Sequence, residues 1–455
     1  MKLVKASGAK ECNKHSVSRS ETRVAQEVTA FVEHELKDIR YQSRTYPKLQ
    51  TLMNRVNEGS IAEEHRKQSQ RKASGIDGMT KKRYEEKLEE NVAELVRRMK
   101  NFGYKPKPVR RTYIPKGNGK MRPLGIPAYE DRLVQAVMAG ILNEIYEERF
   151  LDCSYGFRQK RNAHQVVTEI NRIVMTKKVN WVLEADIKGF FDNVDHDWLM
   201  KFLEHDIEDK NFLRYVKRFL IAGVMEGTER KETDKGTPQG GLISPVLANV
   251  YLHYALDLWC VKVLTAQCRG EVYYIRYADD FLLLFQYEEE ARRAMDALCQ
   301  RLGKFKLEVA KDKTRILPIG RFKGTKEDFD FLGFTFFNTL TRGGKYKLGV
   351  RSSKKKLKAK RQTAKAWLRT RLNEPVGETL RQIQRALAGH SNYYGVSGNY
   401  KEVRKYWEYV KNSTYRMFNR RSQRRSMTRQ KFKRIWDYYV KAPHLTKNIW
   451  IWNRS

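Results

Sequence analysis

Apolar residues at helical spacing mark the chain between residues 88 and 99. Val92, Leu95, Val96 and Met99 recur every three or four positions, which predicts a helix with one face against a core. The Phe102-Gly103 pair that follows predicts a glycine C-cap for this helix. Two further scaffold helices are predicted by apolar pairs, which stand at Leu133-Val134, Val137-Met138, Ile141-Leu142 and Ile145-Tyr146, and at Val166-Val167, Ile170 and Ile173-Val174.

The pattern changes to that of a strand at Trp181-Val182-Leu183-Glu184-Ala185-Asp186. Later, apolar runs at 272–276 and 281–285 flank the sequence Tyr277-Ala278-Asp279-Asp280. Two strand-like runs joined by a short polar segment predict a β-hairpin. Acidic residues are ordinary at a solvated hairpin tip, so this motif alone leaves both a structural and a chemical interpretation open.

A glycine-rich hairpin is predicted at residues 113–127, where two short strands surround Gly117-Asn118-Gly119. Lys116 and Arg122 stand on its two arms. Such a hairpin either faces water or closes an ammonium and a guanidinium group over a phosphate chain.

A second glycine-rich segment, residues 236–245, leads into a predicted helix with Ser244 as its N-cap and Pro245 in its first turn. Its paired glycines permit two interpretations. One is a plain loop, and the other is bare backbone that approaches a ligand closely.

The charge of the chain changes this picture, because 91 Lys and Arg stand against 53 Asp and Glu, a net charge of +38. Such an excess indicates a polyanionic partner, and nucleic acid is favoured. A membrane is excluded as a partner, because no apolar run approaches the ~20 residues of a spanning helix and Met1-Lys2-Leu3-Val4-Lys5 has no signal-peptide core. The five scattered cysteines predict neither a zinc site nor disulfides, and a cytoplasmic protein, nucleoid-associated when it acts on DNA, is expected.

The last stretch of the chain is the most basic. Residues 351–455 hold 28 Lys and Arg against 5 Asp and Glu, with aromatic residues between them. In this stretch Val403, Trp407, Val410 and Phe418 fit one helix face. A separate basic helical domain is therefore predicted, with cations on its surface.

The carboxylates suggest a common chemistry. If the strand that ends at Asp186 and the hairpin lie in one sheet, the acids converge, and alternation along an extended chain lets Asp279 join Asp186 with Asp280 beside it. Clustered carboxylates need cations, and hard oxygen ligands suit Mg²⁺. Two Mg²⁺ ions can activate a 3′-hydroxyl and stabilise a leaving pyrophosphate.

Three motifs carry a family resemblance. Asp186 through Asp192, Thr237-Pro238-Gln239-Gly240-Gly241 and Tyr277-Ala278-Asp279-Asp280 follow one another in the order of the palm motifs of a reverse transcriptase, which they resemble. The group II intron-encoded subfamily is indicated by Ile114-Pro115-Lys116, Arg122-Pro123-Leu124-Gly125-Ile126-Pro127, Ser154-Tyr155-Gly156-Phe157-Arg158 and Phe331-Leu332-Gly333-Phe334. The resemblance covers residues 46 to 440, most of the chain.

The resemblance implies an α+β fold, a right-hand polymerase with fingers and palm whose antiparallel palm sheet packs on helices. An all-α basic thumb and maturase domain follows. We expect an N-terminal extension at residues 1–45, fingers and palm at 46–345, and the thumb and maturase (X) domain at 346–455. The implied function is an RNA-directed DNA polymerase that is also a splicing maturase and supports intron mobility.

The resemblance also implies a role for individual residues. Asp186 and Asp279 would be the principal metal ligands, with Asp280 as the third acid. The other implied nucleotide-site residues are the backbone of Ile187 near a metal, Phe191 as a steric gate against ribonucleotides, Lys116 and Arg122 at the deoxynucleoside triphosphate, Gln239 at the nascent base pair and Lys313 at the leaving pyrophosphate.

The basic C-terminal region resembles the maturase domain of the same family, including its Asn392-Tyr393-Tyr394 signature. The implied partners are a group II intron RNA, an RNA template with a DNA primer, and target DNA. The cations expected to bind RNA phosphates are Lys354, Lys355, Lys356, Arg420, Arg421, Arg424 and Arg425.

Two alternatives stay open at this point. The first is an RNA-binding splicing factor without polymerase activity, although retained repelling carboxylates argue against it. The second is a domesticated reverse transcriptase in antiviral defence. Because the chain stops at Ser455 without Cys pairs or a His cluster, no endonuclease is expected. The sequence does not determine the oligomeric state.

Overall fold

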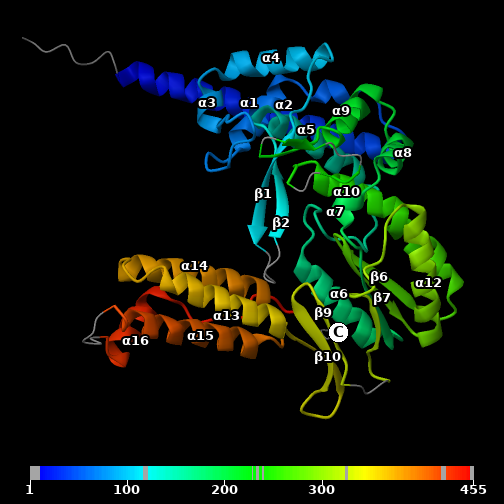
Figure 1. Cartoon of the computed structure of the whole chain (residues 1–455), viewed down its shortest axis with the longest axis vertical. Helices are drawn as coiled ribbons and strands as arrows, with labels where there is room; N and C mark the ends of the chain where they lie inside the picture. Colours follow the sequence, from blue (N-terminus) through cyan, green and yellow to red (C-terminus); the bar gives the residue numbers. More distant parts are fainter. Residues whose placement is uncertain are drawn as a thin grey trace, which may run out of the picture. The chain divides into compact units, whose positions relative to one another are not determined.

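The structure of the chain is a computed structural model that describes residues 11–115, 121–227, 229–231, 235–237, 240–322, 326–421 and 427–450. Helices and mainly antiparallel strands are mixed along the chain, so the predicted α+β class is confirmed (Figure 1). Two compact units are present. Unit 1 comprises Met1–Gln159, Ile187–Trp259 and Arg301–Glu308, and unit 2 comprises Lys160–Asp186, Cys260–Gln300 and Val309–Ser455. The domain boundaries expected at residues 45 and 345 stay a prediction.

Unit 1 is mainly helical. Its helices are α1 (Glu11–Thr45), α2 (Glu58–Lys67), α3 (Lys81–Glu85), α4 (Leu88–Lys100), α5 (Tyr129–Glu147), α7 (Phe190–Asn193), α8 (His196–Asp206), α9 (Lys210–Leu220) and α10 (Ser244–Leu252). Its sheet has the strand order β2-β1-β4-β5, with bounds Met121–Ile126, Val109–Pro115, Val224–Glu226 and Glu229–Lys231. The predicted helices α4 and α5 are therefore confirmed, as are the two strands β1 and β2.

The end of α1 belongs to the core of unit 1. Ile39 is only 1% exposed, and the Ser43 hydroxyl donates to the carbonyl oxygen of Ile145 in α5 over 2.8 Å. Arg40 and Arg44 pair with acidic residues at the end of α5, each across 2.7 Å. The segment expected to be an N-terminal extension thus packs against α5 in its last turns.

The predicted glycine C-cap of α4 is wrong. The helix ends at Lys100, and Phe102 rather than Gly103 has a left-handed φ, of 56°. The carbonyl oxygen of Phe102 accepts a hydrogen bond from Arg218 over 3.0 Å, and its ring lies 4.3 Å from the guanidinium carbon of Arg214. Two arginines of α9 stabilise this turn, an interaction between distant segments that local sequence does not reveal.

The loop before α10 differs from its prediction in one respect. Ile243 rather than Ser244 is the N-cap residue, and Ser244 is the first helical residue, whereas Pro245 lies in the first turn as predicted. A Cβ atom on Gly240 would lie 2.3 Å from the carbonyl oxygen of Gly125. The close approach that this glycine permits is therefore to strand β2. Of the same motif, Pro238 and Gln239 lie outside the described residues.

Unit 2 contains two antiparallel sheets. The first has the order β6-β7-β3-β8, with bounds Val272–Tyr277, Asp280–Phe285, Trp181–Asp186 and Arg315–Pro318, and the second has the order β11-β10-β9, with bounds Tyr346–Ser352, Phe334–Leu340 and Asp328–Phe331. The helices are α6 (Ala163–Thr176), α11 (Thr265–Gln267), α12 (Glu288–Lys304, whose last turn lies in unit 1), α13 (Lys354–Arg369), α14 (Val376–Tyr394), α15 (Tyr400–Phe418) and α16 (Arg429–Tyr439). The predicted strand 181–186, the hairpin and helix α6 are all confirmed.

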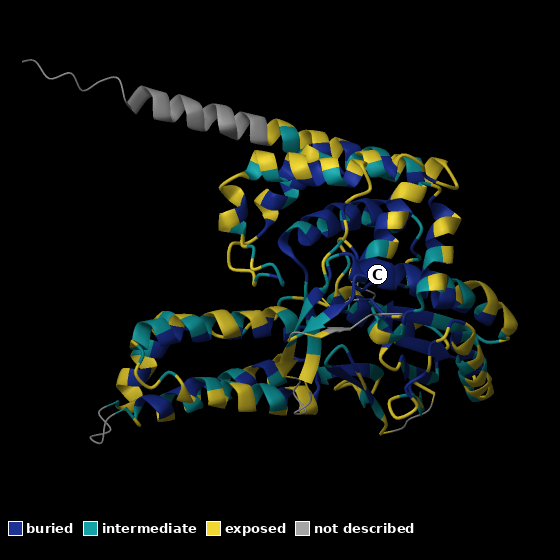
Figure 2. Cartoon of the chain, turned by 45° about the horizontal axis from the view of Figure 1, so that its top comes forward, coloured by how far each residue is buried: buried dark blue, intermediate teal, exposed yellow. Residues whose placement is uncertain are grey.

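The C-terminal helices α13 to α16 form a bundle with its own apolar core (Figure 1). Leu368, Leu380, Ile383 and Trp436 are buried in it. As predicted, Val403, Val410 and Phe418 are buried on one face of α15, and Trp407 packs against the core from its edge. Buried and exposed residues alternate along each helix, as expected of amphipathic helices (Figure 2).

Within the described part of the chain, no helix has both the length and the apolar character needed to cross a membrane.

The turn after β8 generates a stability prediction. Gly320 has a φ of +107°, and a Cβ atom there would lie 2.2 Å from the carbonyl oxygen of Val179. Gly320→Ala should therefore destabilise the protein by more than about 1 kcal/mol. Gly389 lies in helix α14 with open space at the Cβ position, so Gly389→Ala should stabilise by roughly 0.5–1 kcal/mol. Urea unfolding of both variants measures the contrast, and an unchanged midpoint for Gly320→Ala would contradict the steric argument.

Candidate active site

One sheet brings three acidic residues together. Strand β3 lies between β7 and β8, and Asp186 at its end pairs directly with Asp280, the first residue of β7. Residues directly opposite in an antiparallel pair project from the same face. Asp279 lies in the turn that joins β6 to β7. The expected convergence of the hairpin with the strand that ends at Asp186 is confirmed.

The register shows which acid lies directly opposite Asp186. That residue is Asp280. Tyr277 and Asp280 are the last pair of the hairpin, so Ala278 and Asp279 form a two-residue turn, through which the alternation of an extended chain does not continue. The expectation that Asp279 shares a metal ion with Asp186 stays a prediction.

The turn itself has a special backbone. Ala278 has a φ of 58°, a left-handed conformation that residues with a Cβ atom rarely adopt. Such a conformation costs on the order of 1–3 kcal/mol and persists only where its surroundings impose it. Arg276, which is fully buried, donates from Nη1 to the carbonyl oxygen of Ala278 over 3.0 Å. A buried guanidinium thus holds the turn that carries Asp279.

A lysine provides a cation at the end of β3. The amide of Ala310 donates to the carbonyl oxygen of Asp186 over 2.8 Å, and the amide of Lys313 donates to the carbonyl oxygen of Ala310 over 2.9 Å. This loop places the Lys313 ammonium in an ion pair with the Asp186 carboxylate. The hydrogen bond to Asp186 raises the pKa of Lys313.

The electrostatics of the site are set by burial and by neighbouring carboxylates. Burial is the main cause, and the charges of Asp279 and Asp186 the next, of an Asp280 pKa raised to about 7, although its side chain still opens to solvent. Glu184 lies on the same face of β3 as Asp186, and burial raises its pKa despite its ion pair with Arg315 across 2.8 Å. Negative charge is therefore costly here unless a cation accompanies it.

The chemistry of the donors fits a divalent cation. Three carboxylates supply hard oxygen ligands, and the Lys313 ammonium already acts as a cation on one of them. Over the described residues, no three His, Cys, Asp or Glu side chains gather closely enough to hold a metal ion as they stand. Asp186 and Asp280 on one sheet face, with Asp279 in the adjoining turn, are therefore residues that would hold Mg²⁺, although their side chains do not yet form a coordination shell.

A cavity of about 570 Å³ opens beside these acids in unit 2. Asp280 and Asp330 contribute carboxylates to its wall, and Lys355, Lys356 and Lys360 of α13 contribute ammonium groups. Its remaining lining residues are Leu332, Gly333, Ser353, Tyr393 and Tyr394. Three cations thus share one cavity with a candidate catalytic carboxylate, an arrangement that suits a phosphate-bearing ligand.

Two family motifs meet in this cavity. The β9–β10 turn consists of Leu332 and Gly333, with φ values of 50° and 80°. The Tyr393 hydroxyl donates to the carbonyl oxygen of Leu332 over 2.8 Å, and a Cβ atom on Gly333 would lie 2.9 Å from the Tyr394 hydroxyl. In the sequence, Phe331-Leu332-Gly333-Phe334 and Asn392-Tyr393-Tyr394 served only as markers of the family. The Leu-Gly pair between two phenylalanines could also have predicted a tight β-hairpin.

Other predicted nucleotide-site residues lie in unit 1. Phe191 is half-buried, with its ring edge-on to Phe190 and Phe157 at centroid distances of 5.4 and 6.4 Å. Arg122 is exposed on β2, and Ile187 is buried. Lys116 and Gln239 lie outside the described residues.

The predicted RNA-binding cations differ from one another. Lys354, Lys355 and Lys356 are exposed in the first turn of α13, and Arg420 is exposed at the end of α15. In contrast, Arg421 donates to the carbonyl oxygens of Glu374 and Arg371, each over 2.7 Å. Its guanidinium is therefore engaged within the bundle. Arg424 and Arg425 lie outside the described residues.

The chain was compared with known proteins. Residues 114–336 match the family described as "Reverse transcriptase (RNA-dependent DNA polymerase)". The Escherichia coli protein YkfC is 31% identical over 305 residues, which cover 60% of this chain and 78% of that protein. The group II intron-encoded protein LtrA of Lactococcus lactis is 44% identical over 166 residues, 36% of this chain and 27% of LtrA.

A plant relative extends the comparison. Nuclear intron maturase 2 of Arabidopsis thaliana is 32% identical over 111 residues, 24% of this chain and 15% of that protein. The matched region thus spans about a quarter or less of LtrA and of the plant protein. These matches confirm the resemblance found in the sequence. The chain belongs to the reverse transcriptases, the RNA-dependent DNA polymerases, in their group II intron-encoded branch.

Proposed function

We propose that this protein copies RNA into DNA by two-metal-ion nucleotidyl transfer, with Asp186, Asp279 and Asp280 as the metal-holding acids. It also binds a group II intron RNA, assists its splicing and supports its mobility into target DNA. The observation that carries the proposal is the placement of Asp186 opposite Asp280 on one sheet face, beside a lysine-lined cavity.

The chemistry is the attack of a primer 3′-hydroxyl on the α-phosphorus of a deoxynucleoside triphosphate. A bond forms between that oxygen and the phosphorus, and the bond to pyrophosphate breaks. Two Mg²⁺ ions, when bound, would supply Lewis acidity for the attacking and leaving oxygens. The three carboxylates would hold these ions, and the buried Arg276 keeps the Asp279 turn in its left-handed conformation.

Lys313 has a role that follows from its position. Its ammonium neutralises Asp186, one of the residues that would hold a metal ion. The same ammonium group can neutralise the charge of the pyrophosphate that leaves. The ion pair to Asp186 supports the role in product release that the family resemblance implies for this lysine.

The nucleotide is held by residues of unit 1. The Phe191 ring is the steric gate against a 2′-hydroxyl, and its packing against Phe190 and Phe157 supports this role because it limits the ring's movement. Lys116 and Arg122 hold the triphosphate, Gln239 lies at the nascent base pair, and the backbone of Ile187 lies near a metal.

Nucleic acid phosphates bind in the cavity beside Asp280. Lys354, Lys355 and Lys356 stand in the first turn of α13, where the helix macrodipole disfavours positive charge. Helix stability therefore gives no reason for these lysines, whereas an anionic ligand at the helix N-terminus does. Lys355 and Lys356 also line the cavity that contains Asp280, which supports binding of the template and primer close to the acids.

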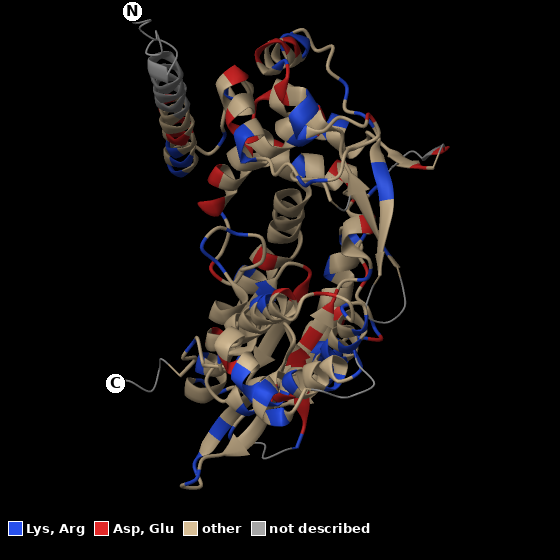
Figure 3. Ribbon diagram, turned by 90° about the vertical axis from the view of Figure 1, so that its left-hand side faces the viewer, with Lys and Arg blue, Asp and Glu red and all other residues tan. Residues whose placement is uncertain are grey.

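The maturase function rests on the C-terminal bundle. Helices α13 to α16 carry many Lys and Arg (Figure 3), and their phosphate contacts bind folded RNA by shape with little reading of bases. We assign the β6-β7-β3-β8 sheet to the palm and α13 to α16 to the thumb and maturase domain. Relatives named intron-encoded protein and intron maturase favour this proposal over a role in antiviral defence.

The first prediction separates catalysis from RNA binding. Asp279→Asn should lower primer extension on an RNA template about 10²–10⁴-fold, because bound metal contributes several kcal/mol to the transition state. Binding of a folded group II intron RNA should not change. The matched control is Asp296→Asn, an exposed carboxylate on α12, which should extend primers like the wild type. Wild-type extension by Asp279→Asn would remove this residue from the catalytic set.

A second prediction concerns pH. Because the pKa of Asp280 is raised to about 7, the folded protein holds this proton more tightly than the unfolded chain does. The resulting stabilisation is complete below about pH 4 and is lost as the pH rises through 7. Without metal, Asp280→Asn should therefore raise the melting temperature at pH 8 more than at pH 5. Added Mg²⁺ should recover stability at pH 8 in the wild type only. An equal effect of the variant at both pH values would contradict the shifted pKa.

The third prediction compares two neighbouring arginines. Arg420 is exposed, so Arg420→Gln should weaken RNA binding and lower the slope of log affinity against log salt by about 1. Arg421 is bonded to two backbone carbonyls, so Arg421→Gln should instead lower the melting temperature and leave the slope unchanged. Filter binding across a salt series and thermal unfolding measure both effects. A lower slope for Arg421→Gln at unchanged stability would reverse the assignment.

A further inference from the structure

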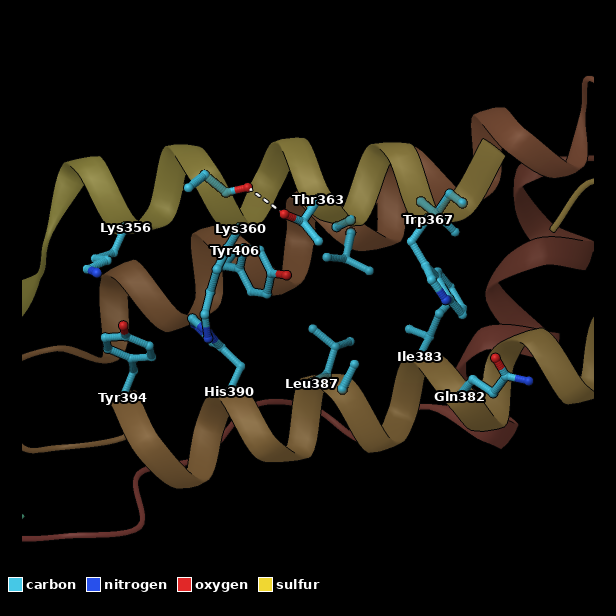
Figure 4. Close-up of a pocket in the computed structure, with 15 residues that line it drawn as sticks. Lys356, Lys360, Thr363, Trp367, Gln382, Ile383, Leu387, His390, Tyr394 and Tyr406 are labelled. Atoms are coloured by element: carbon cyan, nitrogen blue, oxygen red, sulfur yellow. Dashed lines mark hydrogen bonds between the residues drawn. The ribbon is translucent and has the colours of Figure 1, made fainter. Parts of the chain in front are cut away.

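A second cavity of unit 2 lies inside the C-terminal bundle, between α13, α14 and α15 (Figure 4). Its volume is about 550 Å³, in the range of cavities that take small organic ligands. Trp367 and Ala364 of α13 and Ile383 and Leu387 of α14 form apolar walls along most of its length. The residues of the proposed polymerase mechanism do not explain this cavity.

One end of the cavity is polar. His390 is 3% exposed and projects from α14 toward Lys360 and Tyr406 in Figure 4. Its Nδ1 lies 3.2 Å from Nζ of Lys360. An ammonium group can only donate, so Nδ1 is the acceptor and the ring proton is on Nε2. Among the described residues, nothing accepts a hydrogen bond from Nε2. A buried donor therefore stands without an acceptor in the cavity wall.

The ammonium group of Lys360, at the same end of the cavity, has no acidic partner among the described ion pairs. Lys360 contacts His390 and the ring of Tyr394, whose centroid is 4.7 Å from Nζ. No Asp or Glu is among the residues that line the cavity, and the described ion pairs leave Lys360 out. Burial lowers the pKa of both Lys360 and His390, the latter to about 3, so near neutral pH the imidazole is uncharged and its Nε2 is a donor.

We propose that this cavity binds a small amphipathic organic acid. The carboxylate accepts a hydrogen bond from His390 Nε2 and pairs with Lys360, while its apolar part lies between Trp367, Ile383 and Leu387. A nucleic acid phosphate fits less well, because its sugar and flanking phosphates would lie against apolar walls.

Binding of the acid at this site should weaken the binding of template and primer. Lys356, Lys360 and Tyr394 line both this cavity and the one that contains Asp280. A carboxylate on Lys360 neutralises one of the three ammonium groups that face the proposed nucleic acid path. The ligand should therefore raise the KM for the template and primer and leave the turnover rate nearly unchanged.

The test uses the full chain and three probes with the same decyl chain. Decanoate should bind at least tenfold more tightly than 1-decanol or decyltrimethylammonium in isothermal titration calorimetry. Ile383→Trp, which fills the cavity, should abolish decanoate binding. The matched control is Ala366→Trp, an exposed position on α13 outside the cavity, which should bind decanoate like the wild type.

The polar end is tested separately, so that the result does not depend on the folding of one variant. Lys360→Met and His390→Phe should each reduce the preference for decanoate over 1-decanol. Equal affinity for all three probes in the wild type would overturn the proposal. Decanoate binding that survives Ile383→Trp in a folded protein would overturn it too.

Discussion

Repulsion between carboxylates is the constraint on which this site depends. Asp186, Asp279 and Asp280 meet where β3 ends beside the β6–β7 hairpin, and Glu184 lies on the same face. Burial first, and the charges of Asp279 and Asp186 second, raise the pKa of Asp280 to about 7. A cation must accompany the acids, and the Lys313 ammonium does so at Asp186. The same demand for positive charge supports the proposal that these acids hold divalent metal ions.

Holding such groups together requires a backbone that is itself held in place. Two tight turns of unit 2 contain residues with a Cβ atom in the left-handed region, Ala278 and Leu332. Each accepts a side-chain hydrogen bond at its carbonyl oxygen, since Arg276 donates to that of Ala278 and the Tyr393 hydroxyl donates to that of Leu332. A side chain from α14 thus stabilises a turn sixty-one residues earlier in the chain.

Cations in the C-terminal bundle have different functions despite their common charge. Arg421 donates to carbonyl oxygens within the bundle. Lys355 and Lys356 line the cavity that contains Asp280. Lys360 is partly buried and contacts the His390 ring. A count of Lys and Arg therefore identifies a nucleic-acid-binding protein and does not assign a function to any one of them. The assignment depends on which groups lie within hydrogen-bonding distance.

The sequence by itself determined the helices α4, α5 and α6, the strand 181–186, the hairpin around Asp279 and the family, because each rests on local periodicity or on an ordered set of motifs. It did not determine the neighbour of Asp186, since register across a tight turn is set by pairing between strands. Nor did it reveal that Leu332-Gly333 meets Tyr393-Tyr394, that Arg421 is engaged inside the bundle, or that His390 lacks an acceptor. Those contacts join segments far apart in the chain, so only tertiary packing could decide them.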